Sequence, residues 1–537
     1  MIKAFKLLLI FLTLSSYLNA QPRIPEPKPK LVLFLLMDEL NSEQLGIIRQ
    51  KCGNEGFNRI FSGGTTFANA GYSSGSGFPG RNSATLYSGS HAATHGILAR
   101  NWINRFNGTT TDALYGAYSN GRIDSAGKAP SNKLMLASGI ADEMHRIHNG
   151  KSKVYSIGFR PEVLAFTVSA QQDPFFWLNI KTGEMSSNLE LNKKSQPSWV
   201  QDFNSKKLPA TYLERQWAPL VDITEYHEWQ FFLDEKKPSR TFYYAMKDPS
   251  GLYPYQRLAG SPYGNSLVRD FAASLILNES LGKDDITDLL TIEFTTNPSV
   301  RKKNLPLDAE TEDLLLRLDN EVESLLKLID EQVGLHNTLI VCSAIKKPSD
   351  LIQSGDTYNN PRGVFNATKA SSLLNLYLMA LHGQGKWVLD HRSGEIYLNN
   401  ELITKSKIDR NTILKQACDF LLQVEGIANA ISAADLTTAN TIWSSNRAML
   451  QNYHLKRSGD IIFSLEPGWS EELPDGKRLR HSWGQEYVPL AFYGWRVARQ
   501  NIMQPIDMTD VAPTICTFLE ISLPNGNEGK AINGLLH

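Results

Sequence analysis

Residues 74–96, SGSGFPGRNSATLYSGSHAATHG, form a loop-like stretch rich in hydroxyl groups. A serine hydroxyl becomes a nucleophile when a base or a metal ion activates it. Ser74, Ser76 and Ser83 are the candidates in this stretch. The alternative, which we favour, is that these serines cap a helix that begins near Arg81 and satisfy its free N–H groups.

Histidines in and beyond this stretch raise the question of a metal site. His91 and His95 are four residues apart, a spacing that suits a metal ion on one helix face. We favour structural roles for both side chains. His481, in the segment RLRHSWG, is expected to pack against Trp483 or to cap a turn.

Apolar runs that end in polar residues predict the elements that position these groups. Continuous apolar runs are typical of buried parallel strands, whose carboxyl ends open into a site. The runs cover residues 31–37 before Asp38, 153–159 before Arg160, 289–296 before Asn297, 338–344 before Ile345, and 488–494. Helical patterns over 264–282 and 309–334 lie between them. The alternation predicts an α/β fold with a doubly wound, mostly parallel central sheet.

Two stretches interrupt this alternation. Residues 171–262 are rich in Trp, Pro and Asn, and residues 350–480 contain a hairpin-like segment at 387–400. We interpret both as insertions that cap the carboxyl edge of the sheet, where open α/β folds bind ligands. The predicted α/β domain is then 31–537, with caps at about 171–262 and 350–480.

The N-terminus has the features of a secretory signal. Residues 1–20 place two lysines before a short apolar run that ends in a small residue, which predicts a signal peptide. Residues 21–30, QPRIPEPKPK, form a proline-rich tether. Since no later segment is long and apolar enough to span a bilayer, we expect a periplasmic or secreted protein without a transmembrane segment.

Composition excludes several classes of function. The 537 residues carry 55 basic and 55 acidic side chains, so bulk charge favours neither a nucleic-acid binder nor a membrane-surface binder. The four cysteines are widely spaced and contain no CxxC pair. We therefore expect buried free thiols rather than disulfides or a sulfur-bound metal, at the positions Cys52, Cys342, Cys418 and Cys516.

Segments along nearly the whole mature chain resemble the alkaline phosphatase superfamily, in particular the periplasmic phosphate-irrepressible alkaline phosphatases, which are related to nucleotide pyrophosphatase/phosphodiesterases. The matching segments include KPKLVLFLLMDEL at 28–40, YSGSHAATHGILARNW at 87–102, VPLAFYGW at 488–495 and DMTDVAPTICTFLEISLPNGNEGKAI at 507–532. The resemblance implies two zinc ions, held by Asp and His at strand ends, and a Thr or Ser nucleophile between them.

The residues at the corresponding positions of this chain are mostly different. The first-strand acid is retained as Asp38, but the position of the nucleophile, eight residues before Tyr87, is Pro79, which has no hydroxyl. Five further metal-ligand positions carry other residues: Asn297 and Arg301 (or Pro298 and Lys302 in a register shifted by one), Ile345 and Lys346, and Tyr487. A single carboxylate cannot hold zinc at useful affinity, so we expect no bound metal and no catalytic residue.

Substrate-binding positions also differ from the pattern of the family. An expected asparagine is Arg100, next to Asn101, and an expected Lys-x-Arg is Arg160-Pro161-Glu162. The resulting pocket is enriched in cations. We expect these cations to pair with acids in a vacated site, or else to bind a small anion through bidentate hydrogen bonds. The expected pocket comprises Asp38, Arg81, Arg100, Asn101, Arg160, Asn297, Arg301, Lys346 and Tyr487.

The sequence thus favours a secreted, non-catalytic binding or scaffold protein with the fold of an alkaline phosphatase. Two alternatives remain open. One is a phosphomonoesterase or phosphodiesterase with a rebuilt site, using Ser76 or Ser83 with arginines as electrostatic stabilisers. The other is a module that binds phosphate, sulfate or a phosphoester. The sequence does not identify a protein partner.

Overall fold

A computed structural model gives the fold. It describes residues 27–73, 75, 77–105, 108–118, 129–170, 173–191, 195–227, 241–249, 251–300, 307–345, 351–352, 363–438, 444–472, 478–479 and 483–536. The predicted signal peptide at 1–20 lies outside these residues. Among the described helices, none is long and apolar enough to cross a membrane.

The centre of the molecule is a ten-stranded sheet with the order β22-β2-β21-β12-β1-β11-β6-β7-β8, in which β23 also pairs with β2. Most neighbouring strands are parallel, and the pairs β12–β21, β2–β21 and β7–β8 are antiparallel. The strands are β1 (Leu31–Asp38), β2 (Thr65–Ser73), β6 (Val154–Gly158), β7 (Phe175–Leu178), β8 (Met185–Ser187), β11 (Asp288–Phe294), β12 (Thr338–Ile345), β21 (Gln485–Gly494), β22 (Gln500–Ile502) and β23 (Ile506–Asp507). The predicted α/β sheet is confirmed.

The apolar run at 31–37 becomes the central strand β1 because both of its faces are covered. All eight residues of β1 are buried, and the strand pairs in parallel with β11 on one side and β12 on the other. Each fully buried Leu or Phe contributes roughly 1.5–3 kcal/mol. The register places Asp38 opposite Ile345, at the edge where the parallel strands end.

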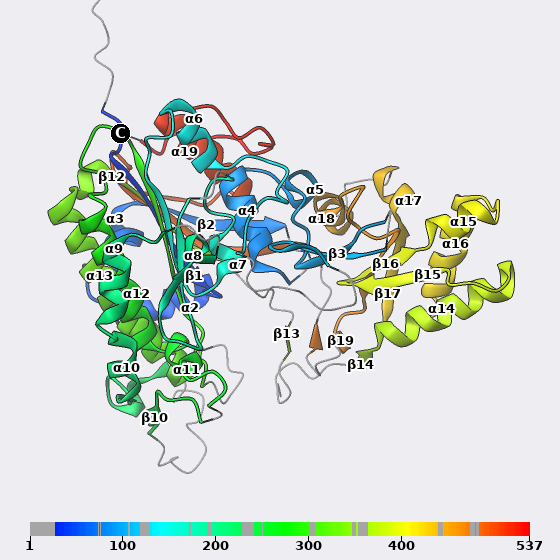
Figure 1. Ribbon diagram of the computed structural model, residues 1–537, viewed down its shortest axis with the longest axis horizontal. Coiled ribbons are helices and arrows are strands. Elements are labelled where there is room, and N and C mark those ends of the chain that lie inside the picture. The colour runs from blue at the N-terminus through cyan, green and yellow to red at the C-terminus, as the bar shows by residue number, and fades with distance from the viewer. Residues whose placement is uncertain are drawn as a thin grey trace, which may run out of the picture.

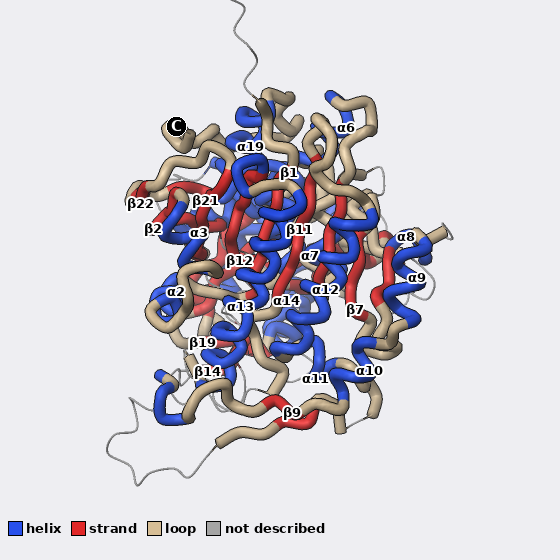
Figure 2. Tube along the Cα trace, turned by 90° about the vertical axis from the view of Figure 1, so that its left-hand side faces the viewer, coloured by secondary structure: helices blue, strands red, loops and turns tan. Residues whose placement is uncertain are grey.

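Helices cover both faces of this sheet. The amphipathic helices α12 (Pro262–Asn278) and α13 (Ala309–Gln332) cover one face, and α4 (Pro79–Ser88), α6 (Ile140–Ile147) and α19 (Val511–Leu519) lie on the other (Figures 1 and 2). Shorter helices complete the layers: α2 (Ser42–Arg49), α3 (Phe57–Gly63), α5 (Ala92–His95), α7 (Pro161–Leu164), α8 (Asn188–Leu191) and α9 (Ser198–Ser205).

Part of the first predicted cap segment, 171–262, belongs to the sheet itself, since β7 and β8 form its edge. The rest contains α10 (Leu208–Leu213), α11 (Gln256–Ala259) and a two-stranded ribbon of β9 (Gln216–Trp217) and β10 (Tyr244–Ala245). Acidic residues in the first turns of α13 hold this ribbon. Asp313 accepts hydrogen bonds from Trp217 Nε1 and Tyr226 Oη, both at 2.6 Å.

The second cap segment forms a separate layer beside the core (Figure 1). Its sheet has the order β15-β16-β18-β17 and its own buried apolar cluster, which includes Leu374, Leu378 and Ile413. The predicted hairpin at 387–400 is confirmed as β15 and β16. The elements are α14 (Ala367–His382), β15 (Val388–Arg392), β16 (Glu395–Leu398), α15 (Asn400–Lys405), α16 (Arg410–Leu421), β17 (Ile427–Ser432), α17 (Ala433–Thr438), α18 (Ser444–Asn452) and β18 (Ile461–Leu465).

Two further small sheets are formed, the second of them by strands of the second cap segment. One contains β3 (Asn101–Ile103), β4 (Thr110–Asp112) and β5 (Gly116–Tyr118), and the other β13 (Leu351–Ile352), β14 (Gly363–Phe365), β19 (Trp469–Glu472) and β20 (Arg478–Leu479). All four cysteines lie in the described residues as free thiols, and three of them are buried, which confirms the prediction of free thiols.

Candidate functional site

The ends of β1 and β11 bring Asp38 against two threonines. Thr296 N–H donates to Asp38 Oδ1 at 2.5 Å, and the Thr296 hydroxyl donates to the same oxygen at 3.1 Å. Thr295 Oγ1 donates to Asp38 Oδ2 at 3.4 Å. The side chain is 8% exposed. Both carboxylate oxygens of this retained family acid therefore accept hydrogen bonds from the protein.

Arg160 forms a buried ion pair that the sequence did not predict. It follows β6, and its Nε donates to Glu293 Oε1 at 2.5 Å, while its backbone N–H donates to Oε2 at 3.0 Å. Glu293 lies within β11 and is 1% exposed. A lone glutamate in an apolar strand was the available signal, because a buried charge must be paired. Arg160 is thus held by the strand beside it.

The charges of this pair are linked to Asp38. Burial raises the pKa of Glu293. The positive charge of Arg160 lowers this pKa, and the negative charge of the nearby Asp38 raises it further. Burial disfavours the charged form of Arg160, but Glu293 and Asp38 outweigh that effect and raise the pKa of the guanidinium. The two terminal nitrogens, Nη1 and Nη2, are buried without a hydrogen-bond partner among the described residues. Both nitrogens are therefore available to donate hydrogen bonds to a further acceptor.

Pro79 is the first residue of α4. Proline suits this position because the first helical N–H has no partner inside the helix. Next to it, Gly80 packs against the backbone of α7: a Cβ at Gly80 would lie 2.3 Å from the Glu162 carbonyl oxygen. The start of α4 is therefore held close to the segment that carries Arg160, and it presents a buried pyrrolidine ring in place of a hydroxyl.

The predicted start of this helix and the predicted capping role of Ser83 are wrong. The N-cap is Phe78, whose side chain makes no capping hydrogen bond, and the helix begins at Pro79 rather than near Arg81. Ser83 lies inside the helix, fully buried, with no partner for its hydroxyl among the described residues. Ser83 is the fifth residue of the helix, and a capping side chain must precede the first turn to reach its free N–H groups. Ser74 and Ser76 lie outside the described residues, so their capping role stays a prediction.

Arg100 and Asn101 lie against Asp112. Arg100 Nε donates to Asp112 Oδ2 at 2.6 Å, and its guanidinium stacks over the rings of Phe78 and Tyr115 at 5.9 and 5.5 Å. Asn101 begins β3 directly opposite Asp112 in β4. The stacking on Phe78 places Arg100 beside the start of α4. The expectation that this cation pairs with an acid is confirmed.

Arg81 ties the core to the cap. It is 2% exposed, and its Nη1 donates to Asn452 Oδ1 in α18 at 2.6 Å. Asn452 Nδ2 in turn donates to Ser73 Oγ at 3.1 Å. Arg81 thus contacts the cap helix directly and is linked to the end of β2 through Asn452.

Of the remaining predicted residues, Asn297 and Tyr487 are described by the structure and two others are not. Asn297 Nδ2 donates to Glu39 Oε2 at 2.9 Å, so this amide faces a carboxylate near Asp38. Tyr487 lies in β21 opposite Gly71 of β2 and is 51% exposed. Arg301 and Lys346 lie outside the described residues.

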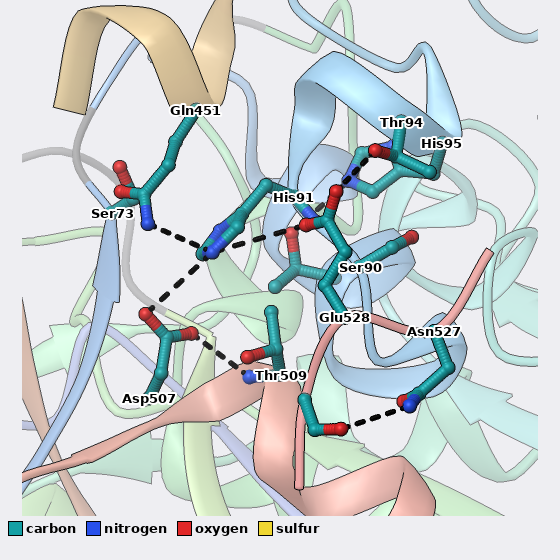
Figure 3. Close-up of polar contacts among 12 residues, drawn as sticks. Ser73, Ser90, His91, Thr94, His95, Gln451, Asp507, Thr509, Asn527 and Glu528 are labelled. Atoms are coloured by element: carbon teal, nitrogen blue, oxygen red, sulfur yellow. Dashed lines mark hydrogen bonds and ion pairs between the residues drawn. The ribbon is translucent and has the colours of Figure 1, made fainter. Parts of the chain in front are cut away.

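The two histidines of the opening stretch have separate partners (Figure 3). His95 is buried and lies 3.1 Å from Thr85 Oγ1, and its Nδ1 accepts from the backbone N–H of Ile97 at 3.1 Å. Burial and the charge of Arg81 lower the pKa of His95 well below its usual value. His91 Nε2 accepts from Gln451 Nε2 at 2.9 Å. Among the described residues, no group of three His, Cys, Asp or Glu side chains is arranged to hold a metal ion. His481 lies outside them.

Comparison with known proteins identifies the family. The model of the type I phosphodiesterase/nucleotide pyrophosphatase family matches residues 32–486. The chain belongs to this family. Among curated relatives it is 25% identical over 546 residues to alkaline phosphatase PafA of Elizabethkingia meningoseptica, with 99% of each chain covered. It is 26% identical to alkaline phosphatase PhoV of Synechococcus elongatus (95% of this chain and 93% of PhoV), and 27% identical to a protein of Myroides odoratus named calcium-transporting ATPase (94% of each).

The fold of this family member agrees with a solved structure. The crystal structure of wild-type PafA superimposes with a TM-score of 0.79 at 23% identity, covering 95% of this chain and 99% of PafA. The resemblance inferred from the sequence motifs is confirmed. In this fold, Asp38, Asn297 and the Arg160 segment meet at one edge of the sheet, whereas Arg81 contacts the cap.

Proposed function

We propose that this family member is a secreted protein that does not hydrolyse phosphate esters by the two-zinc route and acts as a binding or scaffold protein. The observation that carries the proposal is the buried Pro79 at the first position of α4, next to Gly80, which packs closely on the backbone of the Arg160 segment. The resemblance to alkaline phosphatases implies a nucleophilic hydroxyl at this position. A proline ring cannot form the phosphorylated intermediate.

The residues present do not fit the two zinc ions that the family resemblance implies. Of the expected ligands, Asp38 alone is a carboxylate, and both its oxygens already accept hydrogen bonds. Asn297 donates its amide to Glu39, and Tyr487 is a half-exposed phenol. A zinc site needs three or four N, O or S ligands converging at about 2.0–2.3 Å. This donor set supports no such arrangement.

An activity assay tests the proposal. The purified protein is incubated with aryl phosphate monoesters and diesters at saturating zinc, with and without a chelator. We expect no turnover above the uncatalysed background, and no effect of the chelator. Turnover that the chelator abolishes would refute the proposal, and turnover that ignores the chelator would favour a rebuilt site.

A second candidate function, anion binding, is favoured by one observation. Arg160 carries two buried terminal nitrogens that have no acceptor among the described residues. A buried donor without a partner costs about 1–3 kcal/mol, so an oxyanion or water that accepts from it is stabilising. Millimolar phosphate or sulfate should then raise the melting temperature of the wild type and leave that of Arg160→Met unchanged. Equal responses of both proteins would exclude this site.

A further inference from the structure

A groove lies at the end of the molecule opposite to Asp38. It encloses a cavity of about 300 Å³, lined by Lys28, Trp495, Arg496, Phe518, Glu520 and the C-terminal residues 531–536. Lys28 precedes β1, and Trp495 follows the far end of the antiparallel strand β21. The volume is within the range of ligand pockets, roughly 300–1,000 Å³. The groove is therefore large enough to bind a short segment of chain.

The first described residues of the chain border this groove. Trp495 Nε1 donates to the Pro27 carbonyl oxygen at 3.0 Å, and Lys28 Nζ lies 3.2 Å from Glu520 Oε2. An indole N–H that binds a proline carbonyl beside an aromatic wall is a recurring way to recognise proline-rich segments. Residues 21–26, QPRIPE, directly precede this anchored point.

We propose that the groove is the binding site for residues 21–26 of this same chain. Prolines at 22, 25 and 27 favour the polyproline II helix, which has three residues per turn and a rise of about 3.1 Å per residue. Ile24 then lies on the same side as Pro27, roughly 9 Å further along the groove. Phe518, Ile532 and Leu536, which are partly buried apolar residues packed on the core, offer a matching surface for it.

The charges of the segment complement the rim of the groove. The segment carries Arg23 and Glu26, and the rim carries Glu520 together with Lys28 and Arg496. Glu520 is 75% exposed on its side chain, so it can approach a second cation without a large desolvation cost. The consequence is that the tether is held at the end of the sheet remote from Asp38.

Trypsin provides the test, because Arg23–Ile24 is the one susceptible bond inside residues 21–29; Lys28 precedes a proline. The chain that begins at Gln21 is digested under native conditions, and the loss of residues 21–23 is followed by mass spectrometry. A free peptide of residues 21–30 gives the unprotected rate. We expect cleavage in the protein to be at least about tenfold slower than in the peptide, since proteolysis follows the undocked population.

Two variants distinguish docking from mere proximity to the fold. Ile24→Ser, compared with a peptide carrying the same substitution, and Phe518→Ala should each bring the rate close to that of the peptide. Leu455→Ala, at a 69% exposed position in the cap, is the control and should leave the protection unchanged. Thermal unfolding establishes that each variant is folded.

Equal rates in the wild-type protein and the peptide would overturn the proposal. Protection that survives Ile24→Ser would overturn it as well, because the segment would not be bound through that side chain. Neither result depends on zinc, phosphate or enzymatic turnover, so this inference stands or falls separately from the proposed function.

Discussion

Arg160 Nε and Glu293 Oε1 lie 2.5 Å apart, in a pair that is almost completely buried beside Asp38. The arginine occupies a position at which the family resemblance implies a lysine that binds phosphoryl oxygens. In this chain a carboxylate from the neighbouring strand β11 holds it. A buried pair of this kind fixes the local arrangement, and removal of one partner leaves an uncompensated charge.

Glu293→Ala should therefore lower the free energy of unfolding by about 3–5 kcal/mol, because the Arg160 charge loses its partner in a buried position. Urea denaturation measures the change. The control is the double variant Arg160→Met/Glu293→Met, in which no charge remains; it should lose much less. A double variant as unstable as Glu293→Ala would contradict this account of the pair.

Pro79→Thr alone should not produce phosphatase activity. The substitution introduces a hydroxyl, but under our proposal no metal ion is bound that could lower its pKa. Hydrolysis of aryl phosphates at saturating zinc is the measurement, and we expect the same background rate as in the wild type. A chelator-sensitive activity in this single variant would show that a metal site exists without the family ligands.

Restoring the whole set should produce zinc binding. Six substitutions restore the nucleophile and the five altered metal-ligand positions to the residues that the family motif implies: Pro79→Thr, Asn297→Asp, Arg301→His, Ile345→Asp, Lys346→His and Tyr487→His. Because Asp38 and the sheet edge are retained, we expect this variant to bind zinc that the wild type does not bind. Metal content after dialysis measures the difference, and equal zinc in both proteins would contradict it.

The fold was predictable because its central strands are continuous apolar runs. The runs at 31–37 and 338–344 become β1 and β12, each with one further residue at its end. The hydrogen-bond partners of the site residues could not be predicted in the same way. Arg81 was expected in the pocket but binds Asn452, which lies 371 residues away along the chain, and no local pattern encodes that contact. The Glu293 carboxylate was visible as a lone acid in a strand, but its partner depends on strand order.

The insertion that carries β9 and β10 should depend on Asp313. This buried carboxylate accepts hydrogen bonds from Trp217, Tyr226 and the backbone N–H of Leu220, each at 2.6 Å. Asp313→Ala leaves these donors without an acceptor and should cost about 3–5 kcal/mol of unfolding free energy. Asp419→Ala, which removes an exposed carboxylate that pairs with Lys415, is the control and should cost no more than about 1 kcal/mol. Similar losses in both would contradict a special role of Asp313.

The contribution of His145 to the stability of the fold should decrease as the pH rises. Its Nε2 lies 2.8 Å from Asp173 Oδ1, and this hydrogen bond raises the pKa of His145, with Asp142 adding to the effect. A raised pKa in the folded state means that the stabilisation is complete below the unfolded value of about 6.5 and is lost as the pH rises through the folded value. The melting temperature of the wild type should therefore exceed that of His145→Gln by more at pH 6 than at pH 9. A difference that is constant between these pH values would contradict the linkage.

Equilibrium zinc binding by the purified wild-type protein tests the central claim most directly. The protein is dialysed against micromolar zinc, and bound metal is measured by mass spectrometry, with the six-substitution variant as the matched control. We expect less than about 0.1 zinc per wild-type chain, since Asp38 alone cannot hold the ion. Two zinc ions per wild-type chain, removed by a chelator, would contradict the claim that this family member has lost its metal centre.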